Sequence, residues 1–194
     1  PTNLPETTHI SLYADDSNIF APIPRSTGPD RDAAIATIQT ALDTCVQWGD
    51  KWGLNFHKLQ PIIFSPHGSN SPNINPASPP TLLFRNSPVL FSNTKPVRLL
   101  GVWLDQHLSM KHHIEKLVTK VTPRLSILQS IAAHHMGSNK HTLLHIYKSW
   151  ILPILDYASP TYAHAAHRIL KPLDKLQRRA LQIITGSSKT ASSI

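Results

Sequence analysis

Cysteine is almost absent from this chain of 194 residues, which contains only Cys45. A single cysteine excludes an intramolecular disulfide framework and suits a reducing compartment. Histidines are more frequent, and His141 and His145 stand four residues apart, but no cysteine or spaced carboxylate completes a zinc-ligand pattern around them. Because Cys45 falls on the apolar face of a predicted helix, we expect it to be a buried structural thiol.

The chain also lacks any apolar run close to the roughly 18 residues that a membrane span requires. Its N-terminus has no basic region followed by an apolar segment, so no signal peptide is predicted. Glycine is scarce beside proline, at 7 against 17 residues, which predicts long irregular connections, above all a proline-rich loop at 66–80. The sequence begins at Pro1 rather than Met, and we expect a piece of a longer protein.

Acidic residues are few in the second half of the chain. Residues 1–97 hold 6 Lys and Arg against 7 Asp and Glu, whereas residues 98–194 hold 13 against 4. The formal net charge of +8 therefore comes from the second half. This distribution predicts that the second half meets a polyanion such as nucleic acid. The alternative is a set of solvated helix faces with no ligand.

Two adjacent carboxylates, Asp15 and Asp16, lie within a β-prone stretch at 9–20. Apolar residues on both sides of a short polar centre predict a strand, a turn and a second strand. Adjacent carboxylates at a hairpin tip repel each other, and a hard divalent cation such as Mg²⁺ would relieve that repulsion. An ordinary turn that contains two aspartates is the alternative.

Apolar periodicity predicts one helix and several strands in the first half of the chain. The helix is expected to be capped by Asp30 or Asp32 and to end at Gly53, with an apolar stripe that includes Trp52. Short strands are expected at 54–56, 62–64, 81–84, 89–91 and 97–104. Gly101 is expected to break the last of these strands.

The second half is predicted to be mainly helical. A helix with Ser109 as a possible cap is expected to kink or end at Pro123, with the pattern resuming as far as residue 137. Asn139 can cap the next helix, which is expected to bend at Pro153 and to face Trp150 inward among its apolar stripe. The last helix is expected to stop at Gly186.

Four blocks stand in a particular order along the chain. The first is Tyr13-Ala14-Asp15-Asp16, and the second is Trp52–Phe56 with Lys58 and 62–64. The third is Arg98–Asp105, which continues to Leu108 and to His113 and Ile114. The fourth is Ile146 and Tyr147 with Ile151–Tyr157 and then 173–186. In this order they resemble the C-terminal half of a non-LTR (LINE-type, jockey-like) retrotransposon reverse transcriptase, over nearly the whole chain. The resemblance implies an α+β fold, with a partial palm of antiparallel strands and one covering helix at 1–105 and a helical thumb and connection region at 106–194.

This resemblance implies an RNA-directed DNA polymerase that acts on an RNA template, a DNA primer and deoxynucleoside triphosphates, in the nucleus and cytoplasm and without a membrane. Asp15 and Asp16 would be catalytic and would hold two Mg²⁺ or Mn²⁺ ions in the complete enzyme. Nucleotide or primer contacts would come from Tyr13, Lys58, Leu100 and Gly101. Phosphate contacts would come from the basic helices, at Lys111, Lys116, Lys120, Arg124, Lys148, Arg168, Lys171, Lys175, Arg178 and Arg179.

The sequence departs from the family pattern at three points. The spacing before Lys58 is short, and Met110 stands where an aromatic residue is frequent. The third metal carboxylate comes from an upstream strand in the family, yet Glu6 is the sole acid before Tyr13. We therefore expect the chain alone to be inactive. The alternatives are a catalytically dead remnant that acts at most as a basic nucleic-acid-binding module, or an unrelated basic interaction module.

Overall fold

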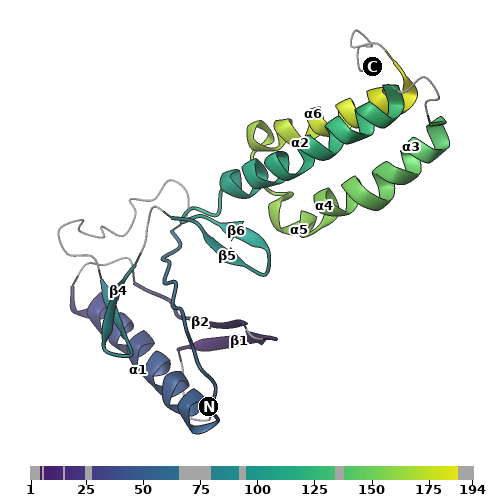
Figure 1. Ribbon diagram of the computed structural model, residues 1–194. Helices are drawn as coiled ribbons and strands as arrows, with labels where there is room; N and C mark the ends of the chain where they lie inside the picture. The colour runs from purple at the N-terminus through teal and green to yellow at the C-terminus, as the bar shows by residue number, and fades with distance from the viewer. Residues whose placement is uncertain are drawn as a thin grey trace. The chain divides into compact units, whose positions relative to one another are not determined.

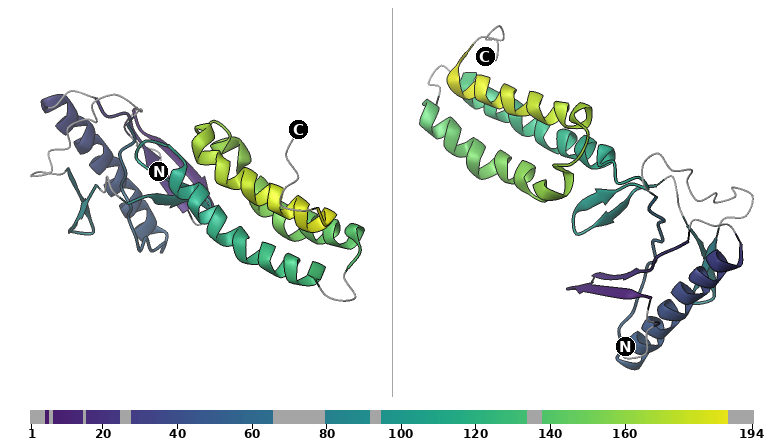
Figure 2. Two further views of the ribbon diagram at one scale, coloured as in Figure 1. Left: turned by 90° about the horizontal axis from the view of Figure 1, so that it is seen from above. Right: turned by 180° about the vertical axis from the view of Figure 1, so that it is seen from behind.

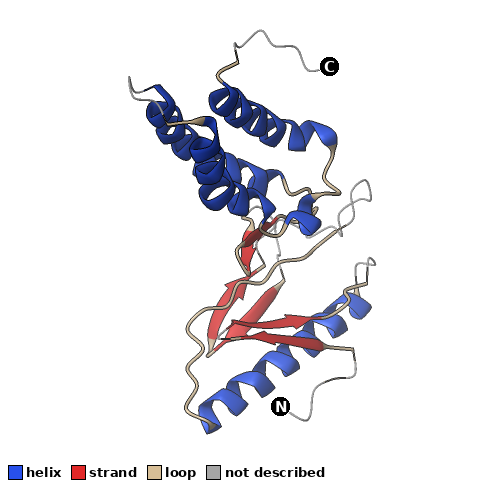
Figure 3. Cartoon of the chain, turned by 90° about the vertical axis from the view of Figure 1, so that its right-hand side faces the viewer, coloured by secondary structure: helices blue, strands red, loops and turns tan. Residues whose placement is uncertain are grey.

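The structure is a computed structural model that describes residues 5, 7–14, 16–24, 28–65, 80–91, 95–133 and 138–187. Glu6, Asp15 and the proline-rich loop up to residue 79 lie outside the described residues. Helices and small antiparallel sheets are mixed in the chain, which agrees with the α+β class (Figure 3). The chain divides into two compact units, 1–95 and 96–194. Within the described residues, no helix has both the length and the apolar character needed to cross a membrane.

The first unit contains two hairpins. Strand β1 (His9–Tyr13) pairs antiparallel with β2 (Asp16–Phe20), as the apolar pattern predicts. Strand β3 (Thr81–Phe84) pairs with β4 (Ser87–Leu90) around a turn at Arg85 and Asn86, whose φ angles are 48° and 63°. Two consecutive left-handed residues match the right-handed twist of a hairpin.

Helix α1 (Pro29–Lys51) is the one long helix among the described residues of the first unit. The prediction that Asp30 or Asp32 caps this helix is wrong, because the helix starts earlier. Gly28 is the N-cap, and Pro29 is pre-organised for the first turn. The two aspartates lie in that first turn, where the helix dipole favours negative charge. Trp52 follows the end of the helix and is 65% exposed, so its predicted inward position is wrong.

The core of the first unit lies between α1 and the residues that follow it. Its buried members are Leu42, Ile63, Leu82 and Phe91. The strands predicted at 54–56 and 62–64 are wrong, because both stretches belong to a segment without regular secondary structure. Cys45 is half-buried on α1, and burial raises the pKa of its thiol.

Close packing at Gly49 brings the irregular chain against α1. A Cβ atom at this buried position would lie 2.5 Å from Cε2 of Phe56, so only glycine allows the approach. Further along α1, Gln39 accepts a hydrogen bond from the Leu83 N–H at 2.8 Å and donates one to the Leu83 carbonyl at 2.9 Å. The Gln39 side chain thus pairs with the backbone N–H and carbonyl of Leu83 at the edge of β3, as a neighbouring strand would.

The second unit combines a hairpin with a helical bundle (Figures 1 and 2). The hairpin is formed by β5 (Val97–Leu99) and β6 (Val102–Leu104). Helix α2 (Lys111–Ala133) runs along α6 (His167–Thr185), with the segments between them packed against α2. These segments are α3 (Lys140–Ile146), the π-helical turn η1 (Tyr147–Ile151), α4 (Leu152–Asp156) and α5 (Ser159–Tyr162). Val102 is buried with these helices, so the hairpin belongs to this unit.

Two prolines lie inside helical segments, at the positions where the sequence predicts a kink, a bend or a helix end. Pro123 lies inside α2 without ending it, because the residue is exposed and its missing hydrogen bond falls on the solvent side. Before Pro153 the chain forms the π turn η1, in which the Leu152 N–H donates to the Tyr147 carbonyl. A π turn shifts the phase of the helical stripe. Trp150 is consequently 39% exposed, and its predicted inward position is wrong.

The ends of the other helices follow the sequence pattern. Asn139 caps α3, and its side chain accepts a hydrogen bond from the Thr142 N–H at 2.8 Å. Gly186 ends α6 in the left-handed conformation at φ 70°. The buried face of α6 contains the predicted stripe, with Leu173, Leu176, Ala180 and Ile184 buried.

The β5–β6 hairpin turns at Leu100 and Gly101, where a single strand broken in its middle was predicted. Both residues have positive φ, 45° and 85°. The Tyr157 hydroxyl, at the turn after α4, donates to the Leu100 carbonyl at 2.5 Å. A Cβ atom at Gly101 would lie 3.1 Å from Cε1 of Tyr157. The strained conformation of Leu100 is therefore held by a side chain from the bundle.

A buried histidine joins β6 to α2. His113 is 2% exposed, and its Nδ1 accepts a hydrogen bond from the Trp103 N–H at 3.4 Å. Its Nε2 is buried without a hydrogen-bond partner among the described residues and lies near the Tyr162 ring, with 5.5 Å between ring centroids. Burial, and then the charge of His112, lower the pKa of His113. The neutral imidazole is the form that fits this position.

Substitutions at Gly101 test the contact with Tyr157. We expect Gly101→Ala to lower the free energy of unfolding by about 2 kcal/mol, because it adds both backbone strain and a close contact. Gly186→Ala is the matched control, since φ is also positive there but nothing lies within 4 Å of the added Cβ. Tyr157→Phe should cost about 1 kcal/mol through the lost hydrogen bond. Urea unfolding measures all three, and equal effects at the two glycines would contradict the role of Tyr157.

The buried histidine predicts a pH dependence of stability. Because the pKa of His113 is lower in the folded than in the unfolded protein, its contribution is present above about pH 6.5 and is lost as the pH falls below it. Urea unfolding at neutral and mildly acidic pH, followed by far-ultraviolet circular dichroism, measures the loss. His113→Gln should reduce it, whereas His164→Gln, at an exposed histidine, should leave it unchanged. An unaltered loss in His113→Gln would refute the assignment.

Candidate metal hairpin and nucleic-acid surface

The β1–β2 hairpin presents the Asp16 carboxylate beside its turn. Tyr13 and Asp16 are paired across the turn, and Ala14 has a left-handed φ of 52°. Asp16 is exposed, and Tyr13 is 64% exposed. Asp15, predicted as the main metal ligand, lies outside the described residues.

The donor chemistry of this tip suits a hard divalent cation. The Asp16 carboxylate forms no ion pair with another described side chain, and carboxylate oxygens are preferred ligands of Mg²⁺. No group of three or more His, Cys, Asp or Glu side chains gathers anywhere in the described part of the chain. A cation held by Asp15 and Asp16 would therefore complete its shell with other oxygens, such as water or substrate phosphates.

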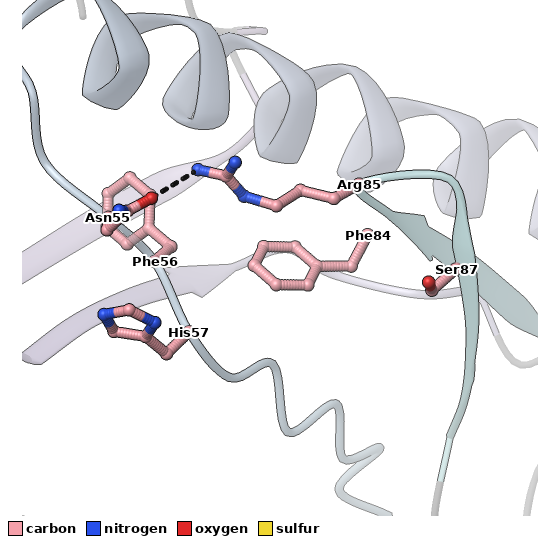
Figure 4. Close-up of a pocket in the computed structure, with 6 residues that line it drawn as sticks. All are labelled: Asn55, Phe56, His57, Phe84, Arg85 and Ser87. Carbon is pink, nitrogen blue, oxygen red and sulfur yellow. Dashed lines mark hydrogen bonds between the residues drawn. The ribbon is translucent and has the colours of Figure 1, made fainter.

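A hollow of about 510 Å³ opens elsewhere in the first unit, between the irregular chain after α1 and the β3–β4 turn (Figure 4). It is lined by Asn55, Phe56, His57, Phe84, Arg85 and Ser87. The Arg85 guanidinium donates to Asn55 at 3.3 Å and to the Asp50 carboxylate at 2.8 Å. Arg85 is the one Lys or Arg among the lining residues, and its charge is already paired with Asp50.

Lys58 lies on the same irregular segment of the first unit. Its side chain is exposed, and it is not among the residues that line the hollow. No described acidic side chain forms an ion pair with it. A predicted contact with nucleotide phosphates requires a free lysine of this kind.

Leu100 and Gly101, the predicted primer contacts, form the turn of the β5–β6 hairpin. Leu100 is 40% exposed. The space next to Gly101 is occupied by the Tyr157 ring, so it is not open to a ligand. One side of the turn is thus occupied by the bundle, and the exposed Leu100 side chain is the part left for a contact.

The predicted basic residues belong to the second unit and lie mainly on two helices. Lys111, Lys116 and Lys120 are exposed on α2, and Lys148 is exposed on η1. On α6 the exposed cations are Arg168, Lys171, Lys175, Arg178 and Arg179. The first four of these recur at intervals of three or four residues, so they form one stripe along about 15 Å of helix. We call them the α6 stripe.

Two of the basic residues are engaged within the bundle. The Arg124 guanidinium lies over the Trp150 ring, with 5.4 Å between Cζ and the ring centroid, and donates to the Lys120 carbonyl at 2.8 Å. Arg179 donates to the Gln129 side chain at 2.9 Å, which links α6 to α2. The α6 stripe has no such partner among the described hydrogen bonds and ion pairs, so its charges are available to a ligand.

The sequence predicted no tertiary contact for Tyr157, His113 or Trp103, although all three lie within the four blocks. Tyr157 lies inside one of the four blocks, but its partner Leu100 is 57 residues away. His113 stands on the apolar stripe of α2, and this position was the one signal that a histidine is buried there. Local periodicity contains no information on what a side chain meets across the bundle.

Comparison with known proteins gives relatives among mobile-element polymerases. The chain is 25% identical over 195 residues to the RNA-directed DNA polymerase from mobile element jockey of Drosophila melanogaster, and the match covers 96% of this chain and 20% of the relative. The corresponding polymerase of Drosophila funebris is 28% identical over 92% of this chain and 18% of its own length. No family model and no solved structure matches the chain.

A further relative matches half of the chain. The Retrovirus-related Pol polyprotein from type-1 retrotransposable element R1 4 of Nasonia vitripennis is 31% identical over 96 residues, which cover 50% of this chain and 24% of the relative. The chain spans about a fifth of the length of the jockey polymerases that it matches. The chain is thus related, over nearly its whole length, to a segment of the reverse transcriptases of non-LTR retrotransposons, as its four sequence blocks predict.

Proposed function

We propose that this chain is a segment of an RNA-directed DNA polymerase, with part of the palm in the first unit and the thumb in the second. The observation that carries the proposal is the match over 96% of the chain to the jockey polymerase of Drosophila melanogaster. Adjacent carboxylates in a hairpin and a basic second half support it. The substrates would be an RNA template, a DNA primer and deoxynucleoside triphosphates.

The hairpin tip would provide the metal ligands. Asp15 and Asp16 would hold divalent cations, Mg²⁺ or Mn²⁺, which supply charge neutralisation for nucleotidyl transfer when bound. Tyr13 is exposed beside them and would contact the primer end. The exposed Lys58 would meet nucleotide phosphates, and the turn at Leu100 would contact the primer backbone.

The second unit would bind the template–primer duplex through its phosphates. The α6 stripe and the exposed lysines of α2 carry positive charge on side chains that other described residues do not neutralise. Contacts of this kind position a duplex without reading its sequence. Such a polymerase would act inside the cell, in the nucleus or cytoplasm.

We propose further that the chain alone binds nucleic acid but does not extend a primer. Two-metal transfer needs a third carboxylate, and the sole acid before Tyr13 is Glu6. The short spacing before Lys58 favours a second candidate, a retroelement remnant that retains binding without chemistry. Both candidates predict the same duplex affinity, and they differ in whether a longer protein containing this segment polymerises.

Charge reversal on the α6 stripe tests duplex binding. We expect the triple variant Lys171→Glu, Lys175→Glu, Arg178→Glu to weaken binding of an RNA–DNA duplex by at least about tenfold at low salt, and to flatten the dependence of affinity on salt by about one unit of slope per lost phosphate contact. Fluorescence anisotropy of a labelled duplex measures both. The control variant Lys51→Glu with Lys140→Glu, at exposed lysines outside the proposed contacts, should change duplex affinity less than the double variant Lys171→Glu, Lys175→Glu. Absence of duplex binding by the parent chain would refute the proposed function.

Metal binding at the hairpin tip is tested with Mn²⁺ alone. We expect Asp15→Asn and Asp16→Asn each to weaken binding of Mn²⁺ by about tenfold, since each removes a charged oxygen ligand. Electron paramagnetic resonance of free Mn²⁺ measures the affinity. Asp30→Asn with Asp32→Asn is the control, because these acids are exposed in the first turn of α1 and outside the hairpin. If the hairpin and control variants lost equal Mn²⁺ affinity, the hairpin tip would not be a specific metal site.

A further inference from the structure

Two tryptophans of the second unit lie beside cations that project from α2. We propose that the surface formed by Trp103, Lys116, Lys120, Arg124 and Trp150, here called the α2 ladder, binds unpaired nucleotides of a single-stranded nucleic acid. This inference rests on the proposed nucleic-acid binding of the same unit. It adds a second form of nucleic-acid ligand, bound by a set of residues that does not include the α6 stripe.

The cations of the α2 ladder share one face of the helix. Lys116, Lys120 and Arg124 recur every fourth residue, so they span about 12 Å along α2. The Lys116 Nζ lies 5.8 Å from the centroid of the Trp103 ring, and the Arg124 Cζ lies 5.4 Å from that of Trp150. Both distances are within the range of a cation–π interaction. An aromatic ring therefore stands at each end of the row, with Lys120 between them.

These cations have no acidic partner within the described part of the chain. The ion pair nearest to them joins His112 to Glu115 at 3.9 Å and includes none of the three. The Arg124 guanidinium is held against Trp150 by its hydrogen bond to the Lys120 carbonyl. Positive charge that is fixed in place and left uncompensated favours an anionic ligand such as a phosphate backbone.

The exposure of Trp150 is the second observation. Apolar periodicity predicts that this residue faces the core, but the π turn η1 moves it outward, and its side chain is 39% exposed. Single π turns in helices are frequent at functional sites. At the other end, Trp103 is half-buried and its ring meets His112 edge-on, with 5.3 Å between centroids. Neither ring completes the buried core of the bundle.

Exposed aromatic rings beside uncompensated cations are the elements that bind single strands. Bases stack on aromatic faces, while the cations meet successive phosphates, and the binding tolerates any sequence. In a duplex the base faces are covered by neighbouring base pairs, so stacking on tryptophan requires unpaired nucleotides. The α2 ladder therefore fits a single strand, whereas the α6 stripe, which contains no aromatic residue, fits a phosphate backbone alone.

Tryptophan fluorescence tests the proposal in the full chain. Trp48→Phe with Trp52→Phe removes the two tryptophans of the first unit, so the remaining signal comes from the α2 ladder. We expect a short oligouridylate to quench this signal, and Trp150→Leu to weaken its binding about tenfold. Trp150→Phe retains a ring and should recover most of the affinity. Trp52→Leu in the parent chain, at a residue 65% exposed, is the matched control and should have no effect.

The outcomes separate this inference from the proposed function. If an RNA–DNA duplex binds but oligouridylate neither quenches the tryptophans nor responds to Trp150→Leu, the α2 ladder is refuted and duplex binding stands. If neither nucleic acid binds at low salt, both proposals fail. Lys120→Gln provides a second variant, since this exposed side chain takes no part in the core. It should weaken oligouridylate binding severalfold, and an unchanged affinity would count against the proposal.

Discussion

Burial of one apolar stripe on α2 is the constraint on which the second unit depends. Ile114, Val121, Leu125 and Leu128 are at most 2% exposed, and Ala180 of α6 is fully buried in the same core. Each large side chain removed from water contributes about 1.5–3 kcal/mol, more than an exposed ion pair. The β5–β6 hairpin and the segments from α3 to α5 pack on this stripe. Lysines and arginines are consequently left on the outer faces of α2 and α6.

The two ends of the β5–β6 hairpin are attached to the bundle by different means. At its base, the Trp103 N–H donates to the buried His113. At its tip, Tyr157 holds the turn through Leu100 and lies against Gly101. A short two-stranded ribbon is marginally stable by itself. These contacts with the helices fix the position of the hairpin turn. Any ligand contact at Leu100 therefore depends on the same contacts.

Charge and carboxylates are divided between the two units. The Asp-Asp hairpin belongs to the first, whose sequence is close to neutral, and the uncompensated cations belong to the second. Under the proposed function, the second unit would hold the backbone of a long polyanion, and the first unit would provide the metal ligands. Contacts within the bundle hold two of these cations in place, Arg124 over the Trp150 ring and Arg179 against Gln129, without neutralising their charge.

The sequence by itself determined the features that depend on neighbours along the chain. The β1–β2 hairpin, the Asn139 cap and the end of α6 at Gly186 all follow from local patterns. The order of the four blocks predicts the similarity to mobile-element polymerases. Only the tertiary structure decided which face Trp150 presents, what approaches Gly101 and which arginines are free. These features arise from contacts between residues as far as 57 positions apart, and apolar periodicity reports which side chains are buried but not what they meet.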